Sequence, residues 1–299
     1  MIFIKAFYRR RIYGRTSKII CLKKWEECMY KAVISDLDGT LLNEKGKVSD
    51  FTRKTVRELI DKGIKFYIAT GRNYGLAKVV MDELGITIPL ISANGARIND
   101  ENGEVIFEDL LGKEEAKKIL EVDYRKYGGN IFMNVFSGED WLVPIGATEH
   151  ISEEERKAFP ALPKEVGEEE LKGLEIQKIF FIGEHEALVE LEKEIIEKTD
   201  GKVAIAFANE TCVEFFSETA NKSNAAKFLL KRDGIDIKDA VSFGDGENDY
   251  EMLTMAGKGF IMGNALYRLK NMMPKDFEII GTNNEDGEAK KLVEIFLNN

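Results

Sequence analysis

Apolar and polar residues follow a regular order through the early part of the chain. Residues 32–34, 64–69 and 88–92 are short apolar runs, and runs of this length predict buried strands. Residues 50–62 and 74–84 lie between them and repeat their apolar positions at helical spacing, which predicts helices. Strands that alternate with helices are expected to be parallel neighbours, with their carboxyl ends along one edge of a sheet.

The alternation of predicted strands and helices stops near residue 111. Before it, residues 96–107 contain two short apolar stretches around an Asn-Gly turn and predict a hairpin. After it, helices are predicted over residues 113–127 and 184–198 and strands over 130–136, 141–144, 176–182, 203–208 and 212–216, with a poorly patterned polar stretch over 148–171. Phe132, Phe136 and Trp141 alternate along two of these strands, and we expect them in the core of this segment rather than on a substrate-stacking surface.

The alternation of strands and helices resumes after this segment. The predicted elements are a helix over residues 222–232, a strand over 240–243, a helix ending at Met255, strands over 259–262 and 277–280, and a helix over 286–297. The sequence therefore predicts an α/β fold whose parallel sheet is built from residues 29–110 and 217–299. Residues 111–216 are interpreted as an α+β insertion between its strands.

The composition narrows the class of protein. The chain has 299 residues, of which 32% are charged and 44% hydrophobic, as expected for a globular protein with room for two domains. Its net charge of −10 argues against a general nucleic-acid-binding role. No apolar run in the sequence reaches the ~18–20 residues of a membrane span. Cys21, Cys28 and Cys212 lack metal-ligand spacing, and such sparse cysteines are typical of a reducing cytoplasm.

The first 28 residues differ from the rest. They contain eight Lys and Arg residues against two Glu, and Met29 stands directly before the first predicted strand. They include no apolar stretch adequate for a secretory signal. We therefore expect residues 1–28 to form a basic extension outside the fold, and we prefer this interpretation to a targeting segment.

The candidate catalytic and ligand-binding residues lie at the expected carboxyl ends of the strands. Asp36 and Asp38 follow the first strand, and residues two apart in an extended chain point the same way. Two carboxylates this close repel each other unless a cation or a proton-transfer role requires them. Thr70 follows the second strand and Asp245 a later one. Asn94 follows the third strand. It could contact a substrate or could simply be a turn residue, and the sequence favours neither role.

Four segments resemble the motifs of the haloacid dehalogenase (HAD) superfamily, in particular its Cof-type phosphatases. In order they are Asp36-Leu37-Asp38-Gly39-Thr40-Leu41-Leu42, Thr70-Gly71-Arg72, Lys222 at the start of a helix, and Gly244-Asp245-Gly246-Glu247-Asn248-Asp249. Four motifs in the right order are far more specific than any one of them. The resemblance runs from Met29 to the C-terminus, and it implies a Rossmann-like core with an α+β cap over residues 111–216.

The resemblance also implies a role for each motif residue. Asp36 is implied as the nucleophile and Asp38 as the acid and base, with Mg²⁺ held by Asp36, Asp245 and the backbone carbonyl of Asp38. Asp249 is implied to orient Asp245 or Lys222. The implied phosphate-binding residues are Leu37, Thr70, Gly71, Arg72, Lys222 and Asn248. The reaction implied is the hydrolysis of small phosphorylated metabolites, such as sugar phosphates or phosphorylated cofactors, through an aspartyl-phosphate.

Two other functions fit the same residues less well. A phosphotransferase or phosphomutase would hand the phosphoryl group to a sugar hydroxyl instead of water, and the cap would decide between these acceptors. A non-catalytic module that binds a phosphorylated ligand needs neither a nucleophile nor an acid, so Asp36 and Asp38 argue against it. The expected assembly is a monomer or a small homo-oligomer in the cytoplasm, with neither a nucleic-acid nor a membrane partner.

Overall fold

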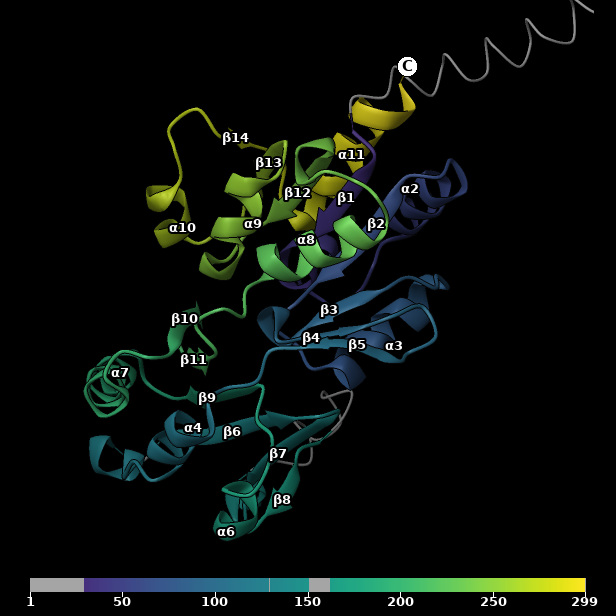
Figure 1. Cartoon of the computed structure of the whole chain (residues 1–299). Helices are drawn as coiled ribbons and strands as arrows, with labels where there is room; N and C mark the ends of the chain where they lie inside the picture. Colours follow the sequence, from purple (N-terminus) through teal and green to yellow (C-terminus); the bar gives the residue numbers. More distant parts are fainter. Residues whose placement is uncertain (1–29, 129, 151–161, 299) are drawn as a thin grey trace, which may run out of the picture.

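The computed structural model describes residues 30–128, 130–150 and 162–298, so the expected extension over residues 1–28 lies outside the described residues. Two sheets organise the described part of the chain (Figure 1). We call the eight-stranded sheet the core sheet and the six-stranded sheet the cap sheet. Within the described ranges, no helix has both the length and the hydropathy that a membrane span requires.

Six strands of the core sheet are parallel. In order across the sheet they are β14 (Glu278–Ile279), β13 (Lys258–Ile261), β12 (Ala240–Gly244), β1 (Ala32–Ser35), β2 (Lys65–Ala69) and β3 (Leu90–Ser92), followed by the antiparallel strands β4 (Arg97–Asn99) and β5 (Val105–Glu108). Asp36, Thr70 and Asp245 directly follow β1, β2 and β12. Because these three strands are parallel, the three residues lie at the same edge of the sheet.

Helices cover both faces of the core sheet (Figure 1). One face packs against α2 (Asp50–Asp61), α3 (Tyr74–Leu84) and α11 (Gly287–Leu292), and the other against α8 (Lys222–Arg232) and α9 (Tyr250–Met255). Val33 of β1 belongs to the first layer, and Ala32 and Ile34 belong to the second. Both faces of β1 are therefore buried, which explains the continuous apolar run before Asp36.

The cap sheet has two different faces. Its strands, in order across the sheet, are β10 (Ala204–Asn209), β11 (Cys212–Phe216), β9 (Lys178–Ile182), β6 (Phe132–Ser137), β7 (Asp140–Pro144) and β8 (Lys164–Val166). One face packs under α4 (Lys113–Leu120) and α7 (His185–Thr199), where Ile179 and Phe181 are buried. Lys178 and Phe180 alternate with these residues along β9 and lie on the opposite face. That face packs against the core near Ala93.

The predicted α/β fold with an inserted α+β segment is confirmed, but several elements differ in detail. The helix predicted over residues 113–127 ends at Leu120, and a separate helical turn follows over Tyr124–Tyr127. Val122 and Tyr124 are both buried in the apolar layer under the cap sheet. Residues two apart do not share a face of a continuous helix, so the chain changes direction between them.

Three short elements escape prediction. The poorly patterned stretch over residues 148–171 contains β8 and α6 (Glu168–Leu171), while residues 151–161 lie outside the described part. Helix α10 (Tyr267–Met272) lies between β13 and β14. None of these three exceeds the six residues of α10, and so short an element shows no clear strand or helix period.

A buried carboxyl group lies beside the first strand. Glu288 of α11 is 2% exposed, and its Oε2 atom lies 2.9 Å from the hydroxyl oxygen of Ser35 in β1. The same hydroxyl oxygen lies 2.7 Å from the backbone oxygen of Asp36. The backbone oxygen of Asp36 can only accept, so when the single hydroxyl proton of Ser35 is donated to it, the hydrogen bond between Ser35 and Glu288 needs a proton on Glu288. Burial raises the pKa of Glu288 to about 8, which agrees with a protonated side chain at neutral pH.

We expect Glu288→Gln to change how the free energy of unfolding depends on pH. The pKa of Glu288 is about 8 in the folded protein against an ordinary value of 4.5, so between these values the folded state keeps a proton that the unfolded state releases. Its contribution to stability is therefore complete below pH 4.5 and falls as the pH rises to about 8. Glutamine does not titrate, so the stability of the variant relative to wild type should rise with pH.

Urea unfolding at about pH 5, 6.5 and 8 measures this difference. Glu251→Gln, on the exposed side of α9, is the matched control and should follow the wild-type dependence. Equal pH dependence in the Glu288 and Glu251 variants would contradict the role of the buried carboxyl group.

Candidate active site

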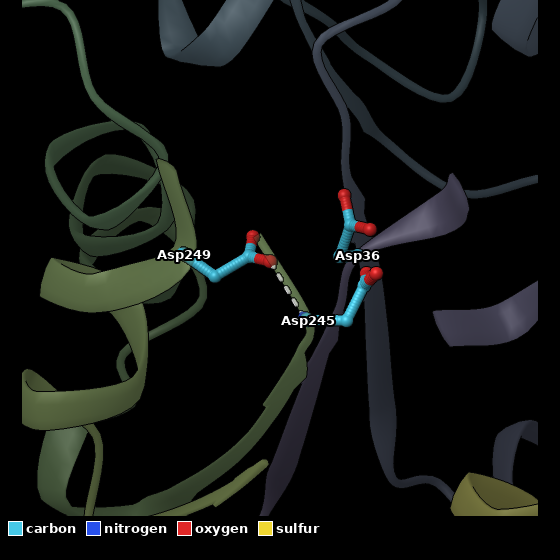
Figure 2. A group of neighbouring side chains, drawn as sticks. All are labelled: Asp36, Asp245 and Asp249. Atoms are coloured by element: carbon cyan, nitrogen blue, oxygen red, sulfur yellow. Dashed lines mark hydrogen bonds between the residues drawn. The ribbon is translucent and has the colours of Figure 1, made fainter. Parts of the chain in front are cut away.

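Three carboxylates gather where β1 and β12 end. Asp36 follows β1, and its backbone N–H donates to the carbonyl oxygen of Phe243 in β12 over 3.0 Å, which ties the two strand ends together. Asp245 follows β12, and Asp249 stands just before α9. Figure 2 shows the side chains of Asp36, Asp245 and Asp249 side by side, and one carboxylate oxygen of each lies within 4.8 Å of the others. The fold thus brings the first and fourth predicted motifs together.

Gly39 makes room for Asp245. Its backbone has a φ of +79°, and a Cβ atom at this position would lie 2.2 Å from Oδ2 of Asp245. A side chain is therefore disfavoured by the conformation and excluded by the contact. The hydroxyl of Thr40 donates to Oδ1 of Asp245 over 3.1 Å. Gly39 and Thr40 of the first motif therefore position the side chain of Asp245 in the fourth motif.

Lys222 lies between two of the carboxylates. Its side chain is 1% exposed, and Nζ donates to Oδ1 of Asp36 at 2.5 Å and to Oδ1 of Asp249 at 2.7 Å. The other oxygen of Asp249 accepts the backbone N–H groups of Asp245 and Gly246, both at 2.9 Å (Figure 2 marks the bond to Asp245). Burial opposes the charge on Lys222, but the two carboxylates outweigh it and raise its pKa. Asp249 therefore orients both Lys222 and the loop that carries Asp245.

Asp36 and Asp245 are suited to hold a divalent cation. Burial raises the pKa of Asp36 well above its usual range despite the neighbouring Lys222, and burial with the charge of Asp249 raises the pKa of Asp245 to about 7. A cation between them would favour both ionised forms. Hard oxygen donors of this kind fit Mg²⁺. Both oxygens of Asp249 are already engaged, which leaves Asp36 and Asp245 as the candidate side-chain ligands, and the backbone carbonyl of Asp38 stays the expected third ligand.

The second motif lies at the end of β2, beside these carboxylates. Thr70 is buried, and its hydroxyl oxygen accepts the backbone N–H of Arg72 at 3.1 Å. Because the hydroxyl is the acceptor there, its own proton stays available to a ligand. The guanidinium of Arg72 donates to both carboxylate oxygens of Asp38, over 2.8 and 2.5 Å. In this conformation the charges of Arg72 and Asp38 offset each other.

Asn248 is held by Asn94, the residue whose role the sequence leaves open. Asn94 is 1% exposed and has a left-handed φ of 59°. Its Oδ1 accepts a hydrogen bond from Nδ2 of Asn248 at 3.0 Å, and its own Nδ2 donates to Glu214 of β11 at 2.5 Å. Asn94 is therefore more than a turn residue, because it belongs to the hydrogen-bond network of the site.

A cleft of about 290 Å³ lies over these groups. The predicted site residues that line it are Asp36, Asp38, Gly71, Arg72, Asp245 and Asn248. Thr70, Lys222 and Asp249 are buried, in hydrogen-bond contact with residues of the site. The side chain of Leu37 belongs to the hydrophobic core, so its backbone N–H is the group that it can offer to a ligand.

The sequence predicts that the cap selects the phosphoryl acceptor, but it does not single out the side chains that the cap sheet contributes to this cleft. Phe136, Lys178, Phe180 and Glu214 also line it. Lys178 and Glu214 are single charges within otherwise apolar strands, and a charge at such a position is the signal by which the sequence could reveal them.

The predicted place of two aromatic residues is wrong. Phe136 and Trp141 do not join the apolar layer under the cap helices. They belong instead to a cluster between the two sheets, together with Ala93 of the core. Strand alternation determines which face a residue takes, and the sequence pattern did not indicate which face of the cap would be turned to the core.

Comparison with known proteins decides the family. The family model for haloacid dehalogenase-like hydrolases matches residues 33–292. The chain belongs to the haloacid dehalogenase-like hydrolase (HAD) family. The matched range contains all four motifs and both sheets of this HAD protein.

Related HAD proteins carry phosphatase names. A Buchnera aphidicola subsp. Baizongia pistaciae protein named "Putative phosphatase" is 36% identical over 269 residues, covering 90% of this chain and 99% of the relative. The HMP-PP phosphatase of Serratia proteamaculans is 30% identical over 264 residues, covering 85% of this chain and 90% of the relative. The structure of a HAD subclass IIB sugar phosphatase has a TM-score of 0.74 and 25% identity, covering 88% of this chain and 98% of that chain. The predicted class, a Cof-type HAD phosphatase, is confirmed.

We expect Gly39→Ala to abolish stabilisation by Mg²⁺. The added methyl group displaces the Asp245 carboxylate, and the left-handed backbone adds a cost of about 1–2 kcal/mol to folding. Gly46→Ala is the matched control, because Gly46 also has a positive φ, of +65°, but nothing lies within 4 Å of its added Cβ. Both variants should therefore lose the stability that the left-handed backbone costs an alanine, and Gly39→Ala should lose more because Asp245 must also move.

Thermal unfolding with and without Mg²⁺ separates the two effects. The ion should raise the melting temperature of wild type and of Gly46→Ala, and leave that of Gly39→Ala unchanged. An equal increase in all three proteins would contradict the role of Gly39 in seating Asp245.

Proposed function

We propose that this HAD phosphatase is Mg²⁺-dependent and hydrolyses small phosphorylated metabolites through an aspartyl-phosphate on Asp36. The observation that carries the proposal is the position of Asp36. Its carboxylate lines the cleft, within 4.8 Å of the Asp245 carboxylate and 2.5 Å from Nζ of Lys222. A nucleophile is thus held against a cation and beside a candidate metal ligand, as phosphoryl transfer requires.

Formation of the intermediate follows from this arrangement. An Oδ atom of Asp36 attacks phosphorus while the bond from phosphorus to the leaving oxygen breaks. Lys222 favours the ionised form of Asp36 by direct hydrogen bonding,. Mg²⁺ bound by Asp36 and Asp245 would neutralise charge on the nucleophile and on the phosphoryl group.

Asp38 is proposed as the acid and base. Asp38 is ionised against Arg72 in the conformation described, so it first takes up a proton from solvent and then passes it to the leaving oxygen. Its carboxylate next takes a proton from the water that hydrolyses the intermediate. The hydrolysis releases inorganic phosphate and regenerates Asp36. The two hydrogen bonds from Arg72 hold Asp38 in the conformation described. We infer that a bound phosphoryl group takes over Arg72, which frees Asp38 for proton transfer.

The phosphoryl oxygens are proposed to bind to four side chains and to nearby backbone N–H groups. The guanidinium of Arg72 and the amide of Asn248 line the cleft. The hydroxyl of Thr70 and the ammonium of Lys222 are hydrogen-bonded to Arg72 and Asp36, which line it. The backbone N–H groups of Leu37 and Gly71 complete the set. Such preorganised donors stabilise the charge that develops in the transition state.

Small substrates agree with the size of the cleft and with the names of the relatives. The cleft volume of about 290 Å³ lies just below the ~300–1,000 Å³ that is usual for ligand sites. The names of two relatives refer to HMP-PP and to sugar phosphates. We propose small phosphate esters of this size, including phosphorylated sugars and phosphorylated cofactor precursors, as the substrates of this protein.

We expect Asp36→Asn to lower kcat by roughly 10³-fold or more, because the amide is a poor nucleophile. Phosphate release from a panel of small phosphate esters, with Mg²⁺ and with a chelator, measures the effect. Asp61→Asn, at the exposed end of α2, is the matched control and should keep wild-type activity.

Asp36→Asn activity close to that of wild type would contradict the covalent mechanism. Transfer of the phosphoryl group to an added sugar, without release of phosphate, would instead indicate a phosphotransferase.

A further inference from the structure

The cap sheet carries a buried ion pair on the face that packs against the core. Lys178 of β9 and Glu214 of β11 are 2% and 5% exposed, and Nζ of Lys178 donates to Oε1 of Glu214 at 2.6 Å. The ring centroids of Phe136 and Phe180 lie 4.9 and 5.2 Å from the same Nζ. The rings stabilise the ammonium by cation–π attraction, so both aromatic residues contribute to holding Lys178 at the cleft.

Stability alone does not explain this pair. Burying two charges costs free energy, and apolar residues of similar volume are often at least as stable as a buried ion pair. The hydrogen bonds that leave the pair offer a better explanation, because each crosses from the cap to the core. Lys178 donates to the carbonyl oxygen of Gly71 at 2.7 Å, and Glu214 accepts from Nδ2 of Asn94 at 2.5 Å.

The contact of Lys178 fixes one of the proposed phosphate-binding segments. The peptide group between Gly71 and Arg72 is bound at both ends. Its carbonyl oxygen accepts from Lys178, and its N–H donates to the hydroxyl oxygen of Thr70 at 3.1 Å. The second contact orients the Thr70 hydroxyl so that its proton is free for a ligand. The ammonium of the cap therefore holds the segment that presents the Thr70 hydroxyl and the Gly71 N–H.

The contact of Glu214 fixes the other segment through two amides. An ionised carboxylate accepts hydrogen bonds and does not donate them, so Asn94 must turn its NH₂ group toward Glu214. The Oδ1 atom of Asn94 then faces Asn248, which must in turn present its own NH₂ group, at 3.0 Å. The orientation of the Asn248 amide is therefore determined by a carboxylate on the cap sheet.

We propose that Lys178 and Glu214 are positioning residues that align the phosphate-binding groups when the cap is docked on the core. Lys178 aligns the Thr70–Gly71 segment, and Glu214 aligns Asn248 through Asn94. The inference rests on the proposed function, since it assumes that these groups bind the phosphoryl oxygens. It assigns to the cap sheet a role in phosphate binding, separate from any contact with the leaving group.

The test uses the double variant Lys178→Met/Glu214→Gln. It leaves neither charge buried without a partner, so it should fold with near wild-type stability, which urea unfolding checks. It removes the donor to Gly71 and replaces the acceptor-only carboxylate by an amide that can bind Asn94 in either orientation. We expect kcat/KM for a small phosphate ester to fall ~10–100-fold, as for other residues that orient binding groups.

Inorganic phosphate provides the decisive readout, because it has no leaving group with which to contact the cap. Its affinity in the presence of Mg²⁺, measured by calorimetry, should fall with kcat/KM in the double variant. The matched control is Gln177→Met. Gln177 also bridges the cap to the core, by donating to Glu108 at 3.2 Å, but that bond reaches neither Gly71 nor Asn94. The control should keep both quantities within ~3-fold of wild type.

Wild-type phosphate affinity in the folded double variant would overturn the proposal, and so would an equal loss of affinity in Gln177→Met. If the wild-type protein releases no phosphate from any ester, the proposed function fails. Phosphate affinity in the variants then still tests the alignment on its own. If wild type does not bind phosphate either, both proposals fail.

Discussion

A lysine buried between two aspartates is the interaction on which the rest of the site depends. Lys222 begins α8, Asp36 follows β1 and Asp249 precedes α9, so one ammonium group joins three segments that are distant in the sequence. Removing one partner of such a buried group typically costs about 3–5 kcal/mol, because the remaining charge is left without compensation. The charges that prepare the site for phosphoryl chemistry are therefore also part of what holds the core together.

The electrostatic balance of this group explains why the site is suited to a cation. Lys222 supplies one positive charge against the buried carboxylates of Asp36 and Asp249 and the half-buried carboxylate of Asp245. Burial raises the pKa values of both Asp36 and Asp245, and the charge of Asp249 adds to the effect at each. A metal ion and the phosphoryl group of a substrate would enter as complementary charges, so each favours the binding of the other.

Local sequence patterns predict those parts of the site that the core sheet positions by itself. The apolar runs that end at Asp36, Thr70 and Asp245 place these residues at one edge, because parallel strands leave little freedom in where their carboxyl ends lie. The pairing of Lys178 with Gly71 joins residues 107 positions apart. Such a contact depends on how the cap docks and on which face of its sheet is turned to the core, and neither has a signature in a short stretch of sequence.

The break between Leu120 and Tyr124 has a similar origin. Helical spacing over residues 113–127 is a local property, whereas the burial of both Val122 and Tyr124 is imposed by the cap sheet and α7. Tertiary packing thus overrides the local pattern at this point. The role of Asn94 could be settled only by tertiary structure for the same reason, because its partners Asn248 and Glu214 come from other parts of the chain.

The two faces of the cap sheet carry different residues, and this affects how the substrate preference of this protein can change in evolution. Along β9, Ile179 and Phe181 maintain the apolar layer under the cap helices, while Lys178 and Phe180 face the cleft. Because neighbouring positions take opposite faces, mutations on the cleft face, apart from the positioning residues Lys178 and Glu214, can remodel the surface that meets a substrate while the residues that fold the cap stay unchanged. Selection can therefore act on the two sets almost independently, and one cap scaffold can acquire new substrate preferences without first losing stability.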